Sequence, residues 1–168
     1  MSPNSICFLG GGRITRILLG GWRAAGTDVG GVLVTDPDGA VTSQLAASFG
    51  PMVEISQVPD GVRDRTMVFL AVHPPVIPEV LGKLRGCLRD DAIVISLAPK
   101  CTLNQLSSQL NGFDRLARVI PNAASIICAG YNPVAWRDGL TEECRDQVRS
   151  VLQPLGQTPE VSESTLET

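Results

Sequence analysis

The sequence predicts an α/β domain built on a doubly wound, mostly parallel β-sheet. Short apolar runs without polar alternation recur along the chain, as expected for strands that are buried on both faces. Helical patterns separate these runs, and the alternation favours right-handed βαβ units. The first run ends in three glycines directly before a helical pattern, which is the layout of a turn that binds the pyrophosphate of a dinucleotide. We therefore expect a Rossmann-like fold.

The expected strands and helices alternate along almost the whole chain. The stronger apolar runs predict strands at 6–9, 32–35, 66–72, 92–97 and 116–121, and weaker runs predict strands at 52–55 and 130–135. Helical patterns predict helices at 13–25, 40–49, 75–85, 102–110 and from the N-cap Thr141 to residue 152. Residues 1–161 form the predicted dinucleotide-binding domain, and the polar segment 162–168 is expected to add nothing to it.

Composition restricts the partners and the compartment. The chain has 168 residues and a net charge of −3 without a basic cluster, so neither nucleic acid nor an anionic membrane is an expected partner. No apolar run approaches the roughly 20 residues of a membrane span, and we expect no signal peptide before the first strand. Five cysteines without a C-x-x-C pair indicate reduced thiols in a cytoplasmic protein, and a single histidine cannot build a histidine-based metal cluster.

The glycine turn is the first candidate binding site. Gly10 permits a tight turn, and Gly12 lets the backbone approach a pyrophosphate without a Cβ in the way. The helix that follows offers free N–H groups and the positive end of its dipole to the anion. The alternative is a glycine-rich strand end at which backbone packs closely without a ligand. The residues assigned to the cofactor here are Leu9, Gly10, Gly11, Gly12, Arg13 and Ile14.

Charged residues near this turn bear on the choice between NAD and NADP as cofactor. Asp36 ends the second predicted strand, where a carboxylate accepts both ribose hydroxyls of NAD and repels the 2′-phosphate of NADP. It also begins the sequence Asp-Pro-Asp-Gly, a good β-turn, and the two roles are compatible. Arg13 is expected to contact phosphate, whereas Arg16 is expected to face solvent.

The carboxyl ends of the later strands supply the remaining candidates, because open α/β sheets bind ligands at that edge. His73 is expected beside the cofactor, but no carboxylate partner can be named for it, so no catalytic residue is assigned. Lys100 is placed either to bind an anionic substrate or phosphate or to be solvated. The residues assigned to the cofactor at these ends are Ala71, Val72, His73, Pro74, Ala98, Pro99, Lys100 and Asn122.

Five motifs, in order and over nearly the whole chain, resemble the N-terminal domain of pyrroline-5-carboxylate reductase. Residues 8–12 resemble the opening glycine motif of that family, and 68–74 resemble its Phe-Leu-Ala-Val-Lys-Pro motif. Residues 95–103 are similar to its Ser-Ile-Ala-Ala-Gly-Val-Thr-Leu segment, 118–122 to its Arg-x-Met-Pro-Asn-Thr-Pro motif, and 156–161 fall at its last strand. The resemblance implies a reductase domain of proline biosynthesis that holds NAD(P)H for hydride transfer to the C=N bond of an imino acid.

The sequence also departs from the family pattern. Thr15 stands where the family has its third glycine or alanine, His73 replaces a lysine, and Pro99-Lys100-Cys101 replaces an Ala-Gly-Val turn. The family continues after 161 into a helical domain that binds the imino acid and forms the homodimer, and 162–168 is too short to provide it. The surface near Ile126, Ile127 and Tyr131, where that domain would pack, is expected to be apolar.

Two other functions stay open beside the reductase hypothesis. A non-catalytic Rossmann module that binds a nucleotide or a protein partner is consistent with the absent helical domain and the substituted turns. A relative of the deazaflavin-dependent NADP oxidoreductases would share the N-terminal fold, although the Ala-Val-His-Pro and Ile-Pro-Asn motifs are less close to that family. A fold alone does not decide between these functions.

Overall fold

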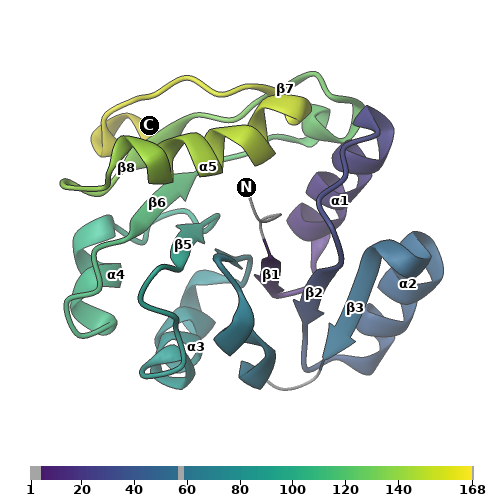
Figure 1. The fold of residues 1–168 in the computed structure, drawn as a ribbon, viewed down its shortest axis with the longest axis horizontal. Coiled ribbons are helices and arrows are strands. Elements are labelled where there is room, and N and C mark those ends of the chain that lie inside the picture. The colour runs from purple at the N-terminus through teal and green to yellow at the C-terminus, as the bar shows by residue number, and fades with distance from the viewer. Residues whose placement is uncertain (1–4, 57–58, 168) are drawn as a thin grey trace.

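In the computed structural model, which describes residues 5–56 and 59–167, seven strands form one sheet in the order β3-β2-β1-β4-β5-β6-β8 (Figure 1). They are β1 (Ile6–Leu9), β2 (Val32–Thr35), β3 (Val53–Ser56), β4 (Met67–Leu70), β5 (Ile93–Ser96), β6 (Leu116–Val119) and β8 (Val134–Trp136). All neighbours are parallel except β8, which runs antiparallel to β6. A separate pair joins β7 (Gly130–Tyr131) to β9 (Gly156–Gln157). The predicted doubly wound, mostly parallel sheet is confirmed.

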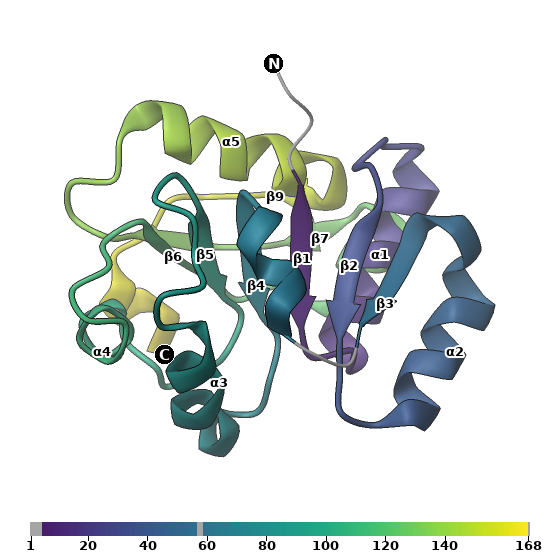
Figure 2. The ribbon, with the colours of Figure 1, turned by 60° about the horizontal axis from the view of Figure 1, so that its bottom comes forward.

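Helices cover both faces of this sheet (Figure 2). One face packs against α1 (Arg13–Ala25), α2 (Gly39–Phe49) and α5 (Glu142–Leu152), and the other packs against α3 (Ile77–Leu84) and α4 (Leu103–Gln109). The central strands send alternate side chains to the two sides, so that Phe8 lies in the first core and Cys7 in the second. Burial on both faces explains why the strand sequences lack polar alternation.

Trp22 of α1 joins the first core to α5. Its ring lies 5.9 Å from the ring of Phe8 and 6.2 Å from that of Phe69, measured between centroids, and the two phenylalanines stack at 4.7 Å. The indole N–H donates to the carbonyl oxygen of Val151 over 2.7 Å. The buried indole donor is therefore satisfied, and α1 and α5 are held together on the same face.

The five cysteines are free in the structure. Cys7 lies in the middle of β1 and is fully buried. Burial raises the pKa of the Cys7 thiol to about 12, because the thiolate would lose its hydration there. This thiol is therefore a packing group of the second core.

Three predicted elements differ from those in the structure. The helix predicted at 75–85 begins at Ile77, after a 3₁₀ turn (Pro74–Val76), because consecutive prolines supply no backbone N–H. The strand predicted at 130–135 divides into β7 and β8 around the Asn-Pro pair at 132–133. The expectation that 162–168 adds nothing is wrong: Glu163–Glu167 form a 3₁₀ helix, and the Glu163 carboxylate pairs with an arginine buried on β6.

Candidate functional site

The candidate site lies at the carboxyl edge of the sheet, where β1 and β4 are neighbours. The crossover from β1 places α1 on one face of the sheet, and the crossover from β4 places α3 on the other. This reversal of strand order is the position at which doubly wound sheets bind ligands. The glycine turn after β1 and the segment 71–74 after β4 meet there, since the Ala71 N–H donates to the Leu9 carbonyl oxygen over 2.8 Å.

Gly10 and Gly11 are closely packed against neighbouring parts of the fold. Gly10 has φ +105°, and a Cβ on it would lie 2.5 Å from the carbonyl oxygen of Ala71. A Cβ on Gly11 would lie 2.6 Å from Cδ1 of Leu45, so this glycine allows α2 to pack against the turn. The tight turn predicted at Gly10 is thus present.

Gly12 differs from its two neighbours. Its φ of −69° suits any residue, and beyond its neighbours in the chain a Cβ on it would have no protein atom within 4 Å. It is the N-cap of α1 and provides no side-chain cap, so the first N–H groups of the helix receive no hydrogen bond from a capping side chain. The turn therefore fits an anion such as a pyrophosphate, because it combines helix N–H donors with room that no protein atom fills.

Two side chains of α1 bond back to the turn. Thr15, at the family's third glycine position, is fully buried, and its hydroxyl donates to the Gly10 carbonyl oxygen over 2.6 Å. Arg16 was expected to face solvent, but it is half-buried and its Nε donates to the Gly11 carbonyl oxygen over 3.4 Å. The Arg16 guanidinium thus contacts the turn, whose Gly11 carbonyl oxygen is an acceptor for it. Arg13 is exposed, and Ile14 packs partly against the first core.

Asp36 connects the glycine turn to the next helix. Its Oδ2 accepts the Gly11 N–H over 2.8 Å, and its Oδ1 accepts the N–H of Asp38, the N-cap of α2, over 2.9 Å. Asp36 therefore shapes the entry into α2 through its side chain. Each carboxylate oxygen keeps further lone pairs, so both hydrogen bonds are compatible with accepting ribose hydroxyls.

The segment after β4 is more open than the sequence indicates. β4 ends at Leu70, so His73 lies three residues beyond the strand rather than at its end. Its side chain is exposed, whereas Ala71, Val72 and Pro74 are half-buried. His73 is the N-cap residue of the 3₁₀ turn that follows, and its side chain makes no cap hydrogen bond there.

The ends of β5 and β6 carry the remaining candidates. The buried Ser96 Oγ accepts the N–H of Ala98 over 3.3 Å, and Pro99 and Lys100 follow on the surface. Lys100 adopts φ +61°, a left-handed conformation that a lysine rarely takes. After β6, the Asn122 Oδ1 accepts the N–H groups of Ala124 and Tyr131, over 3.2 and 3.4 Å. Asn122 therefore shapes its own loop.

Sequence reasoning assigned no role to Arg118, which is fully buried on β6. Its Nη1 donates to Oε1 of Glu163 over 2.9 Å, and the same oxygen accepts the Leu103 N–H at the start of α4 over 2.6 Å. An arginine inside an apolar strand run is the sequence signal for such a pair, because a buried guanidinium needs a bonded counter-charge.

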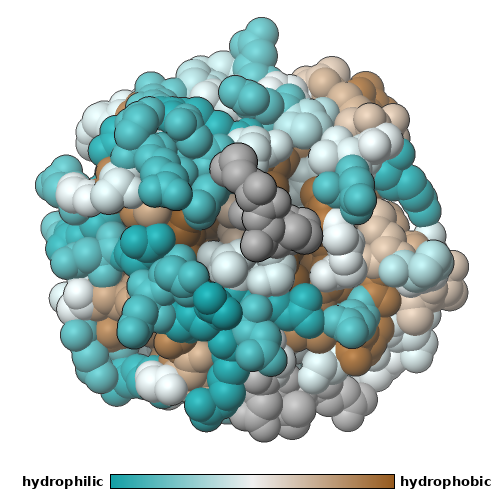
Figure 3. Space-filling view, viewed as in Figure 1, coloured by the Kyte–Doolittle hydropathy of each residue, from teal (hydrophilic) through white to brown (hydrophobic). Residues whose placement is uncertain are grey.

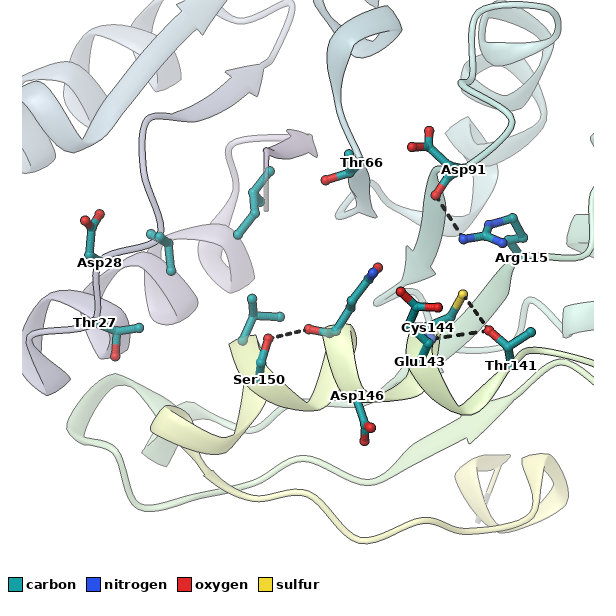
Figure 4. Close-up of a pocket in the computed structure, with 14 residues that line it drawn as sticks. Thr27, Asp28, Thr66, Asp91, Arg115, Thr141, Glu143, Cys144, Asp146 and Ser150 are labelled. Carbon is teal, nitrogen blue, oxygen red and sulfur yellow. Dashed lines mark hydrogen bonds between the residues drawn. The ribbon is translucent and has the colours of Figure 1, made fainter. Parts of the chain in front are cut away.

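A cleft of about 1020 Å³ lies at the opposite edge of the sheet. It is lined by the start of β1, by the segments that precede β2, β4, β5 and β6, and by one side of α5, and Figure 4 shows its polar side chains. The surface over α5 is largely hydrophilic on this side of the molecule (Figure 3). None of the residues assigned to the cofactor lines this cleft.

Two kinds of feature are not found in the part of the chain that the structure describes. Its His, Cys, Asp and Glu side chains form no group that could hold a metal ion. None of its helices is both long enough and apolar enough to cross a membrane.

A βαβ unit with a glycine turn at the reversal of strand order, and an acidic residue after the second strand, defines a Rossmann-type domain. Residues 5–100 match the sequence model of the family described as "NADP oxidoreductase coenzyme F420-dependent". The match covers more than half of the chain, and the chain belongs to this family.

Known proteins confirm the resemblance to pyrroline-5-carboxylate reductase. The Pasteurella multocida and Escherichia coli enzymes of that name are 29% and 27% identical to the chain, and each alignment covers 94% of the chain. The structure of a pyrroline-5-carboxylate reductase from Coxiella burnetii superposes with a TM-score of 0.88 at 26% identity, covering 98% of this chain and 62% of that one.

A Plasmodium falciparum pyrroline carboxylate reductase with NADP bound shares the fold, with a TM-score of 0.83 at 15% identity, over 99% of this chain and 60% of that one. The chain spans 58% of the length of the P. multocida enzyme and 59% of the E. coli enzyme.

Proposed function

We propose that this chain binds NAD(H) or NADP(H) across the carboxyl edge of its sheet and forms the cofactor-binding part of a reductase. Gly12 carries this proposal. Close packing explains Gly10, which lies against the Ala71 backbone, and Gly11, which lies against the Leu45 side chain, but neither packing nor backbone conformation explains Gly12. A glycine that leaves open space at a helix N-terminus is what a pyrophosphate requires.

Each part of the edge has a role in the proposed complex. The N–H groups of α1 and the exposed Arg13 hold the pyrophosphate, and the Asp36 carboxylate accepts ribose hydroxyls while it keeps its bond to Gly11. The segments 71–74 and 96–100, with Asn122, border the nicotinamide. The cofactor supplies the hydride. The residues that border the nicotinamide orient its ring and limit the access of water.

The surroundings of Asp36 favour NAD(H) at least as much as NADP(H). The turn after β2 contains a second carboxylate, Asp38, and no cation, so a 2′-phosphate would meet repulsion there. The cation that could bind the 2′-phosphate instead is Arg13, at the start of α1. The family description and the P. falciparum enzyme name NADP, so the preference of this chain is a direct test of Asp36.

We propose an imino acid as substrate, reduced at its C=N bond, by analogy with the relatives named pyrroline-5-carboxylate reductase. Those relatives are much longer, so the 168-residue chain alone should show no appreciable turnover of pyrroline-5-carboxylate. Ile126, Ile127 and Tyr131 are exposed to 44%, 71% and 50%; we propose that this apolar surface supports self-association. Reduced thiols favour the cytoplasm as its location.

The family description supports a second candidate, a hydride exchange between NADP and a deazaflavin coenzyme. The two candidates predict the same nicotinamide site, but only the second predicts a deazaflavin as the other ligand. Titrating the chain with the deazaflavin in the presence of saturating dinucleotide tests this candidate. Saturable binding of the deazaflavin would support it, and no binding would contradict it.

A thermal-shift comparison of NAD, NADH, NADP and NADPH tests the proposed function. A ligand at ~100 times its dissociation constant adds about 2.7 kcal/mol to the free energy of unfolding. We expect stabilisation by at least one oxidised or reduced dinucleotide. No shift with any of the four at millimolar concentration would contradict the proposal.

A further inference from the structure

The last described segment of the chain reaches back to the edge assigned to the nicotinamide. Glu163 lies 45 residues beyond Arg118 and 60 beyond Leu103, yet one of its carboxylate oxygens bonds both, at 2.9 and 2.6 Å. Arg118 is fully buried, and the Glu163 side chain is 26% exposed. This oxygen therefore ties β6 to the start of α4.

The segment 97–102 runs from β5 to α4 and is anchored at both ends. At β5, the Leu97 N–H donates to the Leu70 carbonyl oxygen of β4 over 3.0 Å, next to the bond between Ala98 and Ser96. At α4, Thr102 and Gln105 form a capping box, in which each side chain accepts from the backbone of the other. Glu163 satisfies the next N–H, that of Leu103. The anchor at α4 thus depends on a side chain from the end of the described chain.

Lys100 makes this segment sensitive to its anchors. It occupies the left-handed region at φ +61°, where L-residues other than asparagine and aspartate are disfavoured. Such a conformation persists when the surrounding structure holds it in place. If the anchor at α4 is weakened, Lys100 can relax toward the favoured regions, and the segment then changes shape.

We propose that Glu163 is a positioning residue for the segment 97–102, and through it for the nicotinamide half of the dinucleotide. This inference rests on the proposed function. Glu163 balances the charge of Arg118 and accepts from Leu103, and both bonds hold the segment in its observed shape. The adenosine diphosphate half is assigned to the glycine turn and Asp36, on the other side of β4.

The experiment compares NADH with ADP-ribose, which lacks the nicotinamide, by isothermal titration of each protein variant. In Glu163→Gln the charge opposite Arg118 is lost. We expect its affinity for NADH to fall by about 2- to 30-fold, the range typical of residues that act through a neighbour, with the affinity for ADP-ribose unchanged. Glu163→Asp keeps the charge but shortens the reach to Leu103. It should also lower the affinity for NADH and leave the affinity for ADP-ribose unchanged. It carries the test if Glu163→Gln does not fold.

The matched control is Glu143→Gln, which removes an exposed carboxylate on α5 at the opposite edge and should change neither affinity. Equal losses for NADH and ADP-ribose would show a general loosening of the domain and overturn the inference. Unchanged NADH affinity in both Glu163 variants would overturn it as well. If the unmodified chain binds neither ligand, the proposed function fails, and the inference fails with it.

Discussion

Substitution of Gly12 by valine separates ligand binding from folding more cleanly than any other change at the turn. Beyond its neighbours in the chain, a Cβ on Gly12 has no protein atom within 4 Å, and the backbone there already has φ −69°. The free energy of unfolding should therefore change by less than about 1 kcal/mol, the scale of an altered helix cap. The branched side chain would fill the space assigned to the pyrophosphate.

The expected loss of affinity follows from the cost of overpacking. Forcing a bulky group into an occupied space costs about 1–3 kcal/mol, and each 1.4 kcal/mol is tenfold in affinity, so dinucleotide affinity should fall roughly 5- to 150-fold. NAD, NADH, NADP and NADPH should lose affinity together, since all four share the pyrophosphate. Isothermal titration measures the affinities, and urea unfolding measures the stability.

Two further variants complete the comparison. Gly31→Val places the same side chain at a glycine that also has open space but lies before β2, at the opposite edge, and it should leave binding intact. Gly10→Ala should impair folding instead, because its Cβ would meet the Ala71 carbonyl oxygen at 2.5 Å with φ at +105°. If Gly12→Val binds dinucleotides as tightly as Gly31→Val, the glycine turn does not hold the pyrophosphate.

Three other predictions concern cofactor choice, strain and pH. Asp36→Ser removes the repulsive carboxylate and the acceptor for the Gly11 N–H. The affinity for NADH should fall, and the preference should move toward NADPH. An unmodified chain that clearly prefers NADPH would refute this role of Asp36. Lys100→Gly should raise the free energy of unfolding by about 1 kcal/mol, because glycine adopts φ +61° without strain; a decrease in urea unfolding would refute it. Burial raises the pKa of the Cys7 thiol from 9.0 to about 12, so the unfolded chain ionises first and stability falls as the pH rises above 9, by up to about 1.4 kcal/mol per pH unit. Cys7→Ala, compared with the unmodified chain under reducing conditions, should lose this part of the alkaline slope, and identical slopes would contradict the assignment.

Local sequence patterns predicted the fold and the main features of the turn. The bounds of α1 follow from the glycines at both of its ends, and Gly26 adopts the left-handed C-cap conformation that the pattern indicates. The buried strands were visible because both faces of the sheet are covered, so their apolar runs are continuous. Gly10 could be assigned to the tight turn because few other residues tolerate it.

Features that depend on long-range contacts were not visible in the sequence. The pairing of Arg118 with Glu163 joins residues 45 positions apart, and no periodicity links them. The bond from Arg16 to the turn depends on a rotamer, and the exposure of His73 depends on where β4 ends. Lys100 departs from the family motif in its sequence, but the sequence did not predict its left-handed backbone, which depends on how the segment 97–102 is held at both ends.

Direct titration of the purified 168-residue chain with NADH and NADPH tests the central claim, that the carboxyl edge of this sheet holds a dinucleotide. Isothermal titration should give saturable binding with one dinucleotide per chain, NADH at least as tight as NADPH, and competition by ADP-ribose. Absence of saturable binding for both at millimolar concentration would contradict the account, and so would binding that ADP-ribose does not displace.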